Sequence, residues 1–290
     1  MTDLIADLLS GGPVVADGAW GTQLQRLGLP GGQCPDQWNL SHAELVEQVP
    51  RAYVAGGSQI VLTNTFRANR VALAEYGLAD QVAAINQAGA AISRRAAGAQ
   101  GRVFGSMGPS GKMLFAEEVT AQQLHDAFAE QAQALAAGGV DALVIETMAD
   151  LEEALIATAA CRTTGLPVVA CAIFDSGKER DRTMTGRTPE QVAEQLSAAG
   201  ADVVGANCGQ GIAAYVGICR RMRAATDRPL WIKPNAGMPR MVGDQAVYDD
   251  DAEQFAAAGA ELVAAGASFL GGCCGTGPGH IRALAQRIRL

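Results

Sequence analysis

One pattern that recurs along the chain constrains the fold more than any other feature. A glycine ends an alanine-rich stretch, a short apolar run follows, and a polar or reactive residue ends that run, as in Gly57 to Asn64, Gly139 to Glu146, Gly200 to Cys208 and Gly266 to Cys273. Glycine is the expected helix C-cap because it tolerates the left-handed conformation. The runs lack strict alternation, which is typical of parallel strands buried on both faces.

Other segments extend this pattern to eight predicted strands. The four additional strands are expected at residues 14–17, 103–107, 168–174 and 230–233. Alanine-rich stretches with helical spacing lie between the strands, at residues 43–56, 79–98, 121–138, 150–164, 189–199, 212–226, 251–265 and 278–289. Thr120, Thr188 and Asp250 stand where helix N-caps are expected, and Pro189 and Pro278 stand where a first helical turn tolerates proline.

Eight strand–helix units without a break in composition predict an α/β fold, a single TIM (β/α)8 barrel that spans residues 1–290 as one domain. Apolar residues make up 49% of the chain and aromatic residues 5%, which suits alanine-rich helices packed closely on a sheet. An open doubly wound sheet is the main alternative. Residues 1–10 carry acidic Asp3 and Asp7 and no basic segment, so we expect a short helix that caps the barrel instead of a signal peptide.

Charge and cysteine content narrow the class of protein. The net charge is −8, from 22 basic and 30 acidic residues, which argues against a nucleic-acid partner. No apolar run reaches the roughly 18–20 residues that a bilayer span needs, so no membrane association is expected. Seven cysteines without an export signal indicate a reducing compartment, and we expect the protein in the cytoplasm.

The barrel prediction has a consequence for function. Active sites of such barrels lie at the C-terminal ends of the strands. The predicted strand ends carry polar or reactive residues, namely Asp17, Asn64, Ser106, Glu146, Cys208, Asn235 and the pair Cys273 and Cys274. These side chains, distant in sequence, are therefore expected to converge on one mouth of the barrel.

The cysteine pair is the sharpest local signal. Adjacent side chains on a strand point to opposite faces, so Cys273 and Cys274 can reach one metal only if the backbone leaves strand geometry, which the flanking glycines permit. Cys208, also at a strand end before a glycine, is a candidate third ligand. Three thiolates suit Zn²⁺ and leave a fourth position for substrate, as in a catalytic site.

Spacing alone leaves alternatives open at these cysteines. A strained vicinal disulfide between Cys273 and Cys274 is one, and a phosphate cradle formed by the glycines of residues 271–279 is another. The remaining cysteines are interpreted as buried packing residues, because free cysteine is among the most buried residue types; they are Cys34, Cys161, Cys171 and Cys219.

Seven short motifs occur in a characteristic order. They are Asp17-Gly18-Ala19-Trp20-Gly21-Thr22, Thr63-Asn64-Thr65-Phe66, Gly108-Pro109-Ser110-Gly111, Glu146-Thr147, Ala206-Asn207-Cys208, Pro234-Asn235-Ala236-Gly237 and Gly271-Gly272-Cys273-Cys274-Gly275-Thr276. From about residue 13 to 285 the chain thus resembles the homocysteine S-methyltransferase family. That family includes the homocysteine-binding module of cobalamin-dependent methionine synthase, betaine–homocysteine methyltransferase and S-methylmethionine-dependent enzymes.

The resemblance implies a TIM barrel whose zinc is held by three cysteines, which match Cys208, Cys273 and Cys274. It implies methyl transfer to homocysteine to form methionine. A free alkyl thiol is mostly protonated at neutral pH, whereas the thiolate is the nucleophile. Zinc as a Lewis acid lets the substrate sulfur bind as a thiolate, so the protein cysteines are expected to be ligands and not nucleophiles.

Homocysteine also presents an ammonium and a carboxylate. In relatives, the positions that match Asp17 and Glu146 contact the amino group. Structural roles compete with this assignment, because Asp17 precedes a glycine and suits a turn, and Glu146 suits a buried ion pair. Candidates for the carboxylate end are Thr63, Asn64, Ser106, which also suits loop hydrogen bonding, and the amide of Gly18. In methionine-synthase-like relatives the residue that matches Asn235 fills the open zinc position when homocysteine is absent, although this asparagine also suits a turn.

The methyl donor is either a small onium compound or a methyl-cobalamin protein encoded separately, since the predicted barrel uses the whole chain. Onium donors favour aromatic cages, for which Trp20, Trp38 and Phe66 are candidates. Betaine users carry an aromatic residue where this chain has Arg67, a cation that repels such donors. We therefore expect a stand-alone homocysteine-activating subunit of the methionine-synthase type, with a betaine or S-methylmethionine enzyme as the alternative.

Two hypotheses assign the chain to other functional classes. A zinc- or thiol-based redox or metal-binding protein would use the same cysteines but would not need Glu146 or Asp17. A phosphate-binding lyase or isomerase barrel would not need the cysteines.

Overall fold

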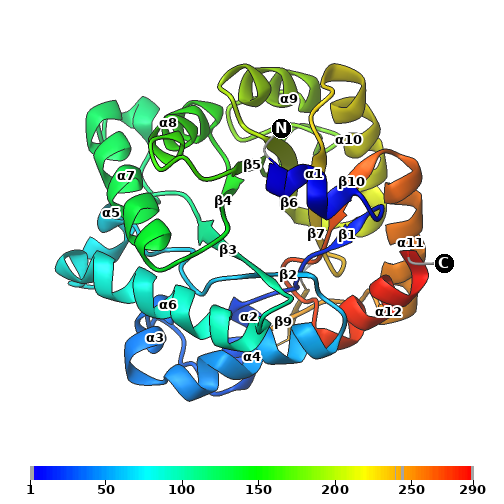
Figure 1. Cartoon of the computed structure of the whole chain (residues 1–290). Coiled ribbons are helices and arrows are strands. Elements are labelled where there is room, and N and C mark those ends of the chain that lie inside the picture. The colour runs from blue at the N-terminus through cyan, green and yellow to red at the C-terminus, as the bar shows by residue number, and fades with distance from the viewer. Residues whose placement is uncertain (1–2, 239, 243–244, 289–290) are drawn as a thin grey trace.

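Eight parallel strands form the central sheet of the protein (Figure 1). The structure is a computed structural model that describes residues 3–238, 240–242 and 245–288. The sheet order is β1-β10-β7-β6-β5-β4-β3-β2. Its strands are β1 (Val14–Val15), β2 (Ile60–Leu62), β3 (Arg102–Met107), β4 (Ala142–Met148), β5 (Val168–Ala172), β6 (Val203–Gly211), β7 (Leu230–Asn235) and β10 (Ala267–Leu270).

The two end strands of this order meet and close the sheet. A parallel bridge pairs Ala16 with Ile60, and the Gln59 amide donates to the Val15 carbonyl over 2.8 Å. The predicted TIM (β/α)8 barrel is therefore confirmed, and each of the eight predicted strands is present. The open doubly wound alternative was wrong, because its edge strands would remain unpaired.

Helices follow the strands and surround them (Figure 1). The long helices lie within a few residues of their predicted bounds: α4 (Ala43–Ala55), α6 (Val82–Ala97), α7 (Ala121–Ala137), α8 (Leu151–Arg162), α9 (Pro189–Ala198), α10 (Ile212–Ala225), α11 (Ala252–Ala264) and α12 (Pro278–Ile288). Shorter pieces are α1 (Asp3–Leu9), α2 (Gly21–Arg26), η1 (Pro35–Gln37), α3 (Trp38–Ser41), α5 (Arg70–Ala74), η2 (Ala79–Gln81), η3 (Leu114–Ala116) and the antiparallel pair β8 (Arg240–Val242) and β9 (Gln245–Val247).

The predicted N-caps are correct with one exception, whereas Gly57, Gly139, Gly200 and Gly266 each follow the C-cap residue by one position, with left-handed backbone. Thr120 and Thr188 cap α7 and α9, each in a reciprocal capping box with the glutamine three residues later. The prediction of Asp250 as the cap of α11 was wrong by one residue. Asp251 is the cap, because its carboxylate accepts from the amides of Glu253 (3.0 Å) and Gln254 (2.9 Å), and Gln254 completes the box.

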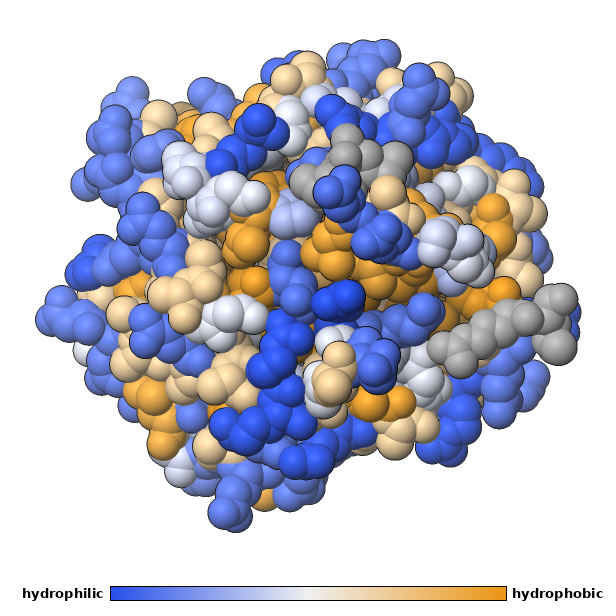
Figure 2. Space-filling model, in the orientation of Figure 1, coloured by the Kyte–Doolittle hydropathy of each residue, from blue (hydrophilic) through white to orange (hydrophobic). Residues whose placement is uncertain are grey.

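Alternation along the strands divides the buried side chains into two layers. One layer fills the barrel interior, where the Trp231 ring stacks on Phe104 and tilts against Phe269. Ile5 joins this layer, so α1 caps the N-terminal end of the barrel, as expected. Figure 1 views the barrel from that end, with α1 in front. Figure 2 shows the same face, where hydrophilic residues cover much of the periphery.

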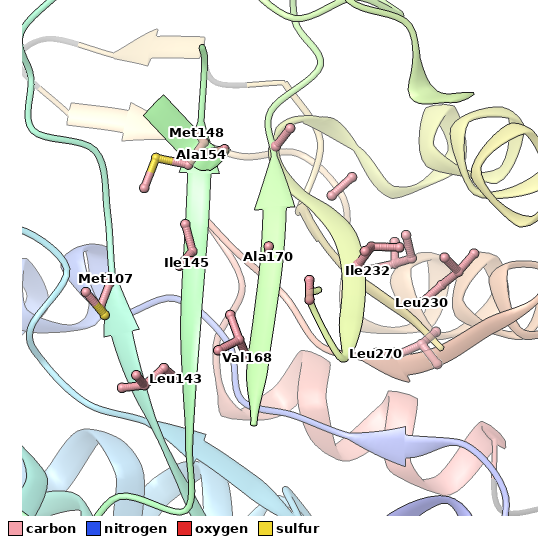
Figure 3. Packing of buried hydrophobic residues seen from close by; sticks show 14 of the residues in the cluster. Met107, Leu143, Ile145, Met148, Ala154, Val168, Ala170, Leu230, Ile232 and Leu270 are labelled. Atoms are coloured by element: carbon pink, nitrogen blue, oxygen red, sulfur yellow. The ribbon is translucent and has the colours of Figure 1, made fainter. Parts of the chain in front are cut away.

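The second layer lies between the strands and the outer helices. Figure 3 shows part of it, with Leu143, Ile145, Val168 and Ile232 projecting from the sheet. The four cysteines interpreted as packing residues are all buried: Cys34, Cys161, Cys171 and Cys219. None of the helices in the described part of the chain has the length and apolar character to cross a membrane.

Candidate metal centre and substrate cavity

Three cysteines meet at the C-terminal end of the barrel. The Sγ atoms of Cys208, at the end of β6, and of Cys273 and Cys274, after β10, lie within 4.8 Å of one another. Cys208 leaves strand geometry with φ +63°, in the left-handed region that non-glycine residues rarely adopt. Each cysteine in the chain is a free thiol, so the structure contains no vicinal disulfide between Cys273 and Cys274.

Hydrogen bonds beside the thiols join the loop after β1, at Gly18 and Ala19, to the loop after β10, which carries the cysteine pair. The Thr276 hydroxyl donates to the Cys273 carbonyl (2.7 Å) and accepts from the Ala19 amide (3.0 Å). The Tyr53 hydroxyl donates to the Ala19 carbonyl over 2.6 Å. A Cβ at Gly18 would lie 2.8 Å from both Thr276 Oγ1 and the Tyr53 ring, so the close approach of the loops requires glycine.

The donor set fits a soft cation such as zinc. Three sulfurs within 4.8 Å of one another suit a tetrahedral site with one further position. Hydrogen bonds from Cys208 and Cys273 lower the pKa of the Cys274 thiol to about 3. Asn235 is buried beside them and donates to the Gly209 carbonyl (3.3 Å), while its Oδ1 has no partner among the described residues. A buried orphan carbonyl oxygen is a suitable additional ligand for a metal.

A cavity of about 340 Å³ opens in front of the thiols. It brings together most of the predicted site residues, which line it with the three cysteines: Gly18, Trp20, Thr63, Asn64, Phe66, Ser106 and Glu146. Trp38 was also a candidate but is not among the lining residues. Its buried ring is stacked on His42 at a centroid distance of 4.4 Å, which turns it into a packing residue of the outer layer.

The floor of the cavity carries a buried ion pair. Lys233 Nζ lies 2.6 Å from Asp17 Oδ1, and the two side chains are 3% and 0% exposed. Asp17 Oδ2 accepts from the Trp20 indole (2.9 Å) and the Leu62 amide (2.8 Å). Burial opposes the charge of Lys233, but the carboxylates of Asp17 and Glu146 outweigh it and raise the pKa of the lysine. Lys233 is therefore a cation in the cavity floor.

Glu146 lies beside this pair at the end of β4. Its Oε1 accepts from the Ser106 hydroxyl (2.5 Å), and its Oε2 has a longer contact of 3.5 Å with Asn207 Nδ2. Burial raises the pKa of the Glu146 carboxyl. The side chain keeps an oxygen with spare accepting capacity toward the cavity.

Two other residues predicted to bind the substrate carboxylate form hydrogen bonds within the protein instead. The Thr63 hydroxyl contacts Thr65 Oγ1 (2.5 Å) and accepts from the Ser106 amide (2.9 Å). Asn64 Nδ2 donates to the Pro35 carbonyl (2.8 Å) and to an asparagine of α3. These side chains shape the cavity wall, and their hydrogen-bond donors have protein partners.

The match to a known family comes from the sequence comparison. The profile described as "Homocysteine S-methyltransferase" matches residues 14–288. The chain belongs to the homocysteine S-methyltransferase family. This confirms the resemblance drawn from the seven motifs, and it removes the phosphate-binding lyase or isomerase as an explanation of the barrel.

Individual relatives support the assignment to the homocysteine S-methyltransferase family. The chain is 33% identical to a methionine synthase of Mycobacterium tuberculosis over 311 residues and 30% identical to that of Mycobacterium leprae over 305 residues. Each alignment covers 99% of this chain but 25% of the relative, so the chain spans about a quarter of the length of these proteins. The fold is similar to that of the homocysteine methyltransferase MmuM from Escherichia coli in its metallated form, with a TM-score of 0.80, 23% identity and coverage of 98% of this chain and 99% of MmuM.

Sequence reasoning missed two participants in this site. Lys233 was expected only as the last residue of a strand, although its spacing of two from the inward-facing Trp231 places it inside the barrel. Thr147, with φ +61°, exchanges hydrogen bonds with Asn207 across two strand ends. No pattern in the sequence indicates that pairing, because it depends on the register of β4 and β6.

Proposed function

We propose that this homocysteine S-methyltransferase forms methionine by methyl transfer to homocysteine, with zinc held by Cys208, Cys273 and Cys274, and that residues 1–290 act as one homocysteine-binding barrel domain. The observation that carries the proposal is the convergence of three thiols from two strand ends on the wall of one cavity. When bound there, zinc supplies a Lewis acid that keeps the homocysteine sulfur as the reactive thiolate.

The residues of the chain perform binding and positioning. Glu146, whose Oε2 has only a 3.5 Å contact with Asn207 and keeps accepting capacity, accepts hydrogen bonds from the substrate ammonium. Asn235 Oδ1, which has no partner among the described residues, would be a further ligand for the metal in the absence of substrate. The Cys208 turn is held by Tyr215, whose hydroxyl donates to the Cys208 carbonyl over 2.7 Å.

For the methyl donor we propose a methyl-cobalamin module, in keeping with the similarity to methionine synthases. Arg67 lines the outer part of the cavity, and its charge disfavours a cationic donor. A second candidate is a small onium donor such as glycine betaine or S-methylmethionine. Trp20, Phe66 and the buried carboxyl of Asp36 line the same cavity and favour that candidate.

The assignment is tested with two cysteine variants. Cys208→Ser removes one of the proposed ligands and should abolish stoichiometric zinc and methionine formation. Cys161→Ala, which removes a buried thiol on α8 that contacts Met107, is the matched control and should keep both. Zinc that stays stoichiometric in Cys208→Ser contradicts the metal assignment. Supplying methylcobalamin, glycine betaine and S-methylmethionine in parallel decides the donor.

A further inference from the structure

The cavity floor presents one cation and one anion that do not pair with each other. Of the carboxylates in the described ranges, that of Asp17 alone lies within 4.0 Å of Lys233 Nζ. Glu146 receives hydrogen bonds from Ser106 and Asn207, and it forms no ion pair with any residue that the structure describes. Lys233 and Glu146 line the same cavity as the three thiols.

Lys233 has donors to spare. An ammonium group carries three N–H donors, and the hydrogen bond to Asp17 Oδ1 uses one. The side chain is 3% exposed, so bulk water does not reach the others freely. Because β7 places Lys233 two residues beyond Trp231, its ammonium lies directly above the apolar layer that fills the barrel. An anionic group that enters the cavity would find a fixed cation at its base.

The Asp17 side chain, by contrast, is 0% exposed and is not among the residues that line the cavity. Its carboxylate accepts from Lys233, from the Trp20 indole and from the Leu62 amide. A substrate ammonium at Asp17 would have to displace one of these buried partners. Lys233 therefore occupies the place beside Asp17 that the family resemblance assigns to the substrate amino group, and Glu146 remains as the carboxylate with capacity for it.

We propose that Lys233 binds the carboxylate of the amino-acid substrate while Glu146 binds its ammonium, with Asp17 as the positioning residue that holds Lys233. The inference rests on the proposed function, since it takes homocysteine as the ligand. A zwitterion adds no net charge to the buried floor and gives Lys233 and Glu146 one additional partner each. The site thus selects thiols that carry both groups of an α-amino acid.

The test measures binding of three thiols to the zinc-loaded full chain by calorimetry. They are homocysteine, γ-mercaptobutyrate, which lacks the amino group, and homocysteamine, which lacks the carboxylate. Lys233→Met should weaken the first two by roughly 10- to 100-fold and leave homocysteamine unchanged or tighter. Glu146→Gln should show the converse, with weaker binding of homocysteine and homocysteamine. Lys178→Met, at an exposed lysine of the loop after β5, is the matched control and should bind all three like the unaltered protein.

The outcomes separate the two proposals. Equal weakening of all three thiols in Lys233→Met, or no weakening of any, overturns the role of Lys233. Absence of homocysteine binding by the unaltered zinc-loaded protein instead overturns the proposed function itself. Because Lys233→Met leaves Asp17 buried without its cation, the double variant Asp17→Asn with Lys233→Met is measured as well. It removes both charges and should show the same selectivity for thiols without a carboxylate.

Discussion

Asn207 and Thr147 exchange two hydrogen bonds across the ends of β6 and β4. The Thr147 amide donates to Asn207 Oδ1, and Asn207 Nδ2 donates to Thr147 Oγ1, each over 2.7 Å. Asn207 Nδ2 also lies 3.9 Å from Cys273 Sγ. Both strand ends adopt left-handed backbone at this point, at Thr147 and at Cys208. One side chain thus links the proposed ammonium-binding end of the cavity to the thiol cluster.

This link predicts an effect on metal binding from a residue that is not a ligand. Asn207→Ala removes the support of both left-handed turns, and outer partners of metal ligands typically contribute 10- to 100-fold to metal affinity. We therefore expect zinc affinity to fall by roughly that factor, measured by competition with a chromophoric chelator. An Asn207→Ala protein that melts like the unaltered chain and binds zinc equally well would show that the pairing is not needed for the metal centre.

Glu146 separates the methyltransferase from a redox or metal-storage protein. Glu146→Gln keeps the shape of the side chain but removes its charge, so homocysteine affinity should fall by roughly 10- to 100-fold while zinc stays stoichiometric. Glu152→Gln, at an exposed glutamate in the first turn of α8, is the control and should change neither. Homocysteine binding that survives Glu146→Gln would favour the redox explanation.

Asp36 predicts a pH dependence of stability. Burial raises the pKa of its carboxyl from 3.8 to about 6, although the Arg67 amide donates to it. The folded protein favours the neutral Asp36 carboxyl. Its contribution to stability is therefore fully present below the unfolded pKa and is lost as the pH rises through the folded pKa. Asp36→Asn removes that loss, so between about pH 4 and pH 8 its free energy of unfolding should gain on the order of 3 kcal/mol relative to the unaltered protein. Urea denaturation at several pH values measures the difference, and a difference that does not change with pH contradicts the assignment.

Gly18 predicts a steric effect on the cavity. A methyl group there would lie 2.8 Å from Thr276 Oγ1 and from Tyr53, so the loop that carries the cysteine pair must shift. Gly18→Ala should cost about 1–3 kcal/mol of stability and weaken zinc binding. Gly21→Ala, at the first residue of α2 and with open space around its Cβ, is the matched control. Equal melting temperatures and zinc affinities of the two variants would contradict the close-packing argument.

Much of the fold could be predicted from the sequence because local signals repeat. Each helix end, buried strand and cap reports on its own neighbourhood, so eight weak patterns together specify a barrel. The one wrong cap, Asp250 instead of Asp251, arose where adjacent residues carry the same chemistry. The three cysteines could be predicted because strand ends of a barrel share one mouth and few residue types bind metal.

The polar network of the cavity could not be predicted in the same way. Asp17 was expected to meet the substrate, but the structure pairs it with Lys233, which lies 216 positions away in sequence. Thr63 and Asn64 have suitable chemistry, yet neighbouring loops use their polar atoms. Trp38 packs in the outer layer, where its ring stacks on His42. Such partners depend on register and loop paths that a single sequence does not state.

X-ray absorption at the zinc edge of the zinc-loaded protein, before and after homocysteine is added, tests whether the three cysteines hold a zinc that binds the substrate sulfur. We expect zinc bound by three sulfurs, with a lighter atom in the fourth position, and a change to four sulfurs when homocysteine binds. Zinc whose coordination stays unchanged in saturating homocysteine, or the absence of a zinc–sulfur signal in fresh reduced protein, would contradict this expectation.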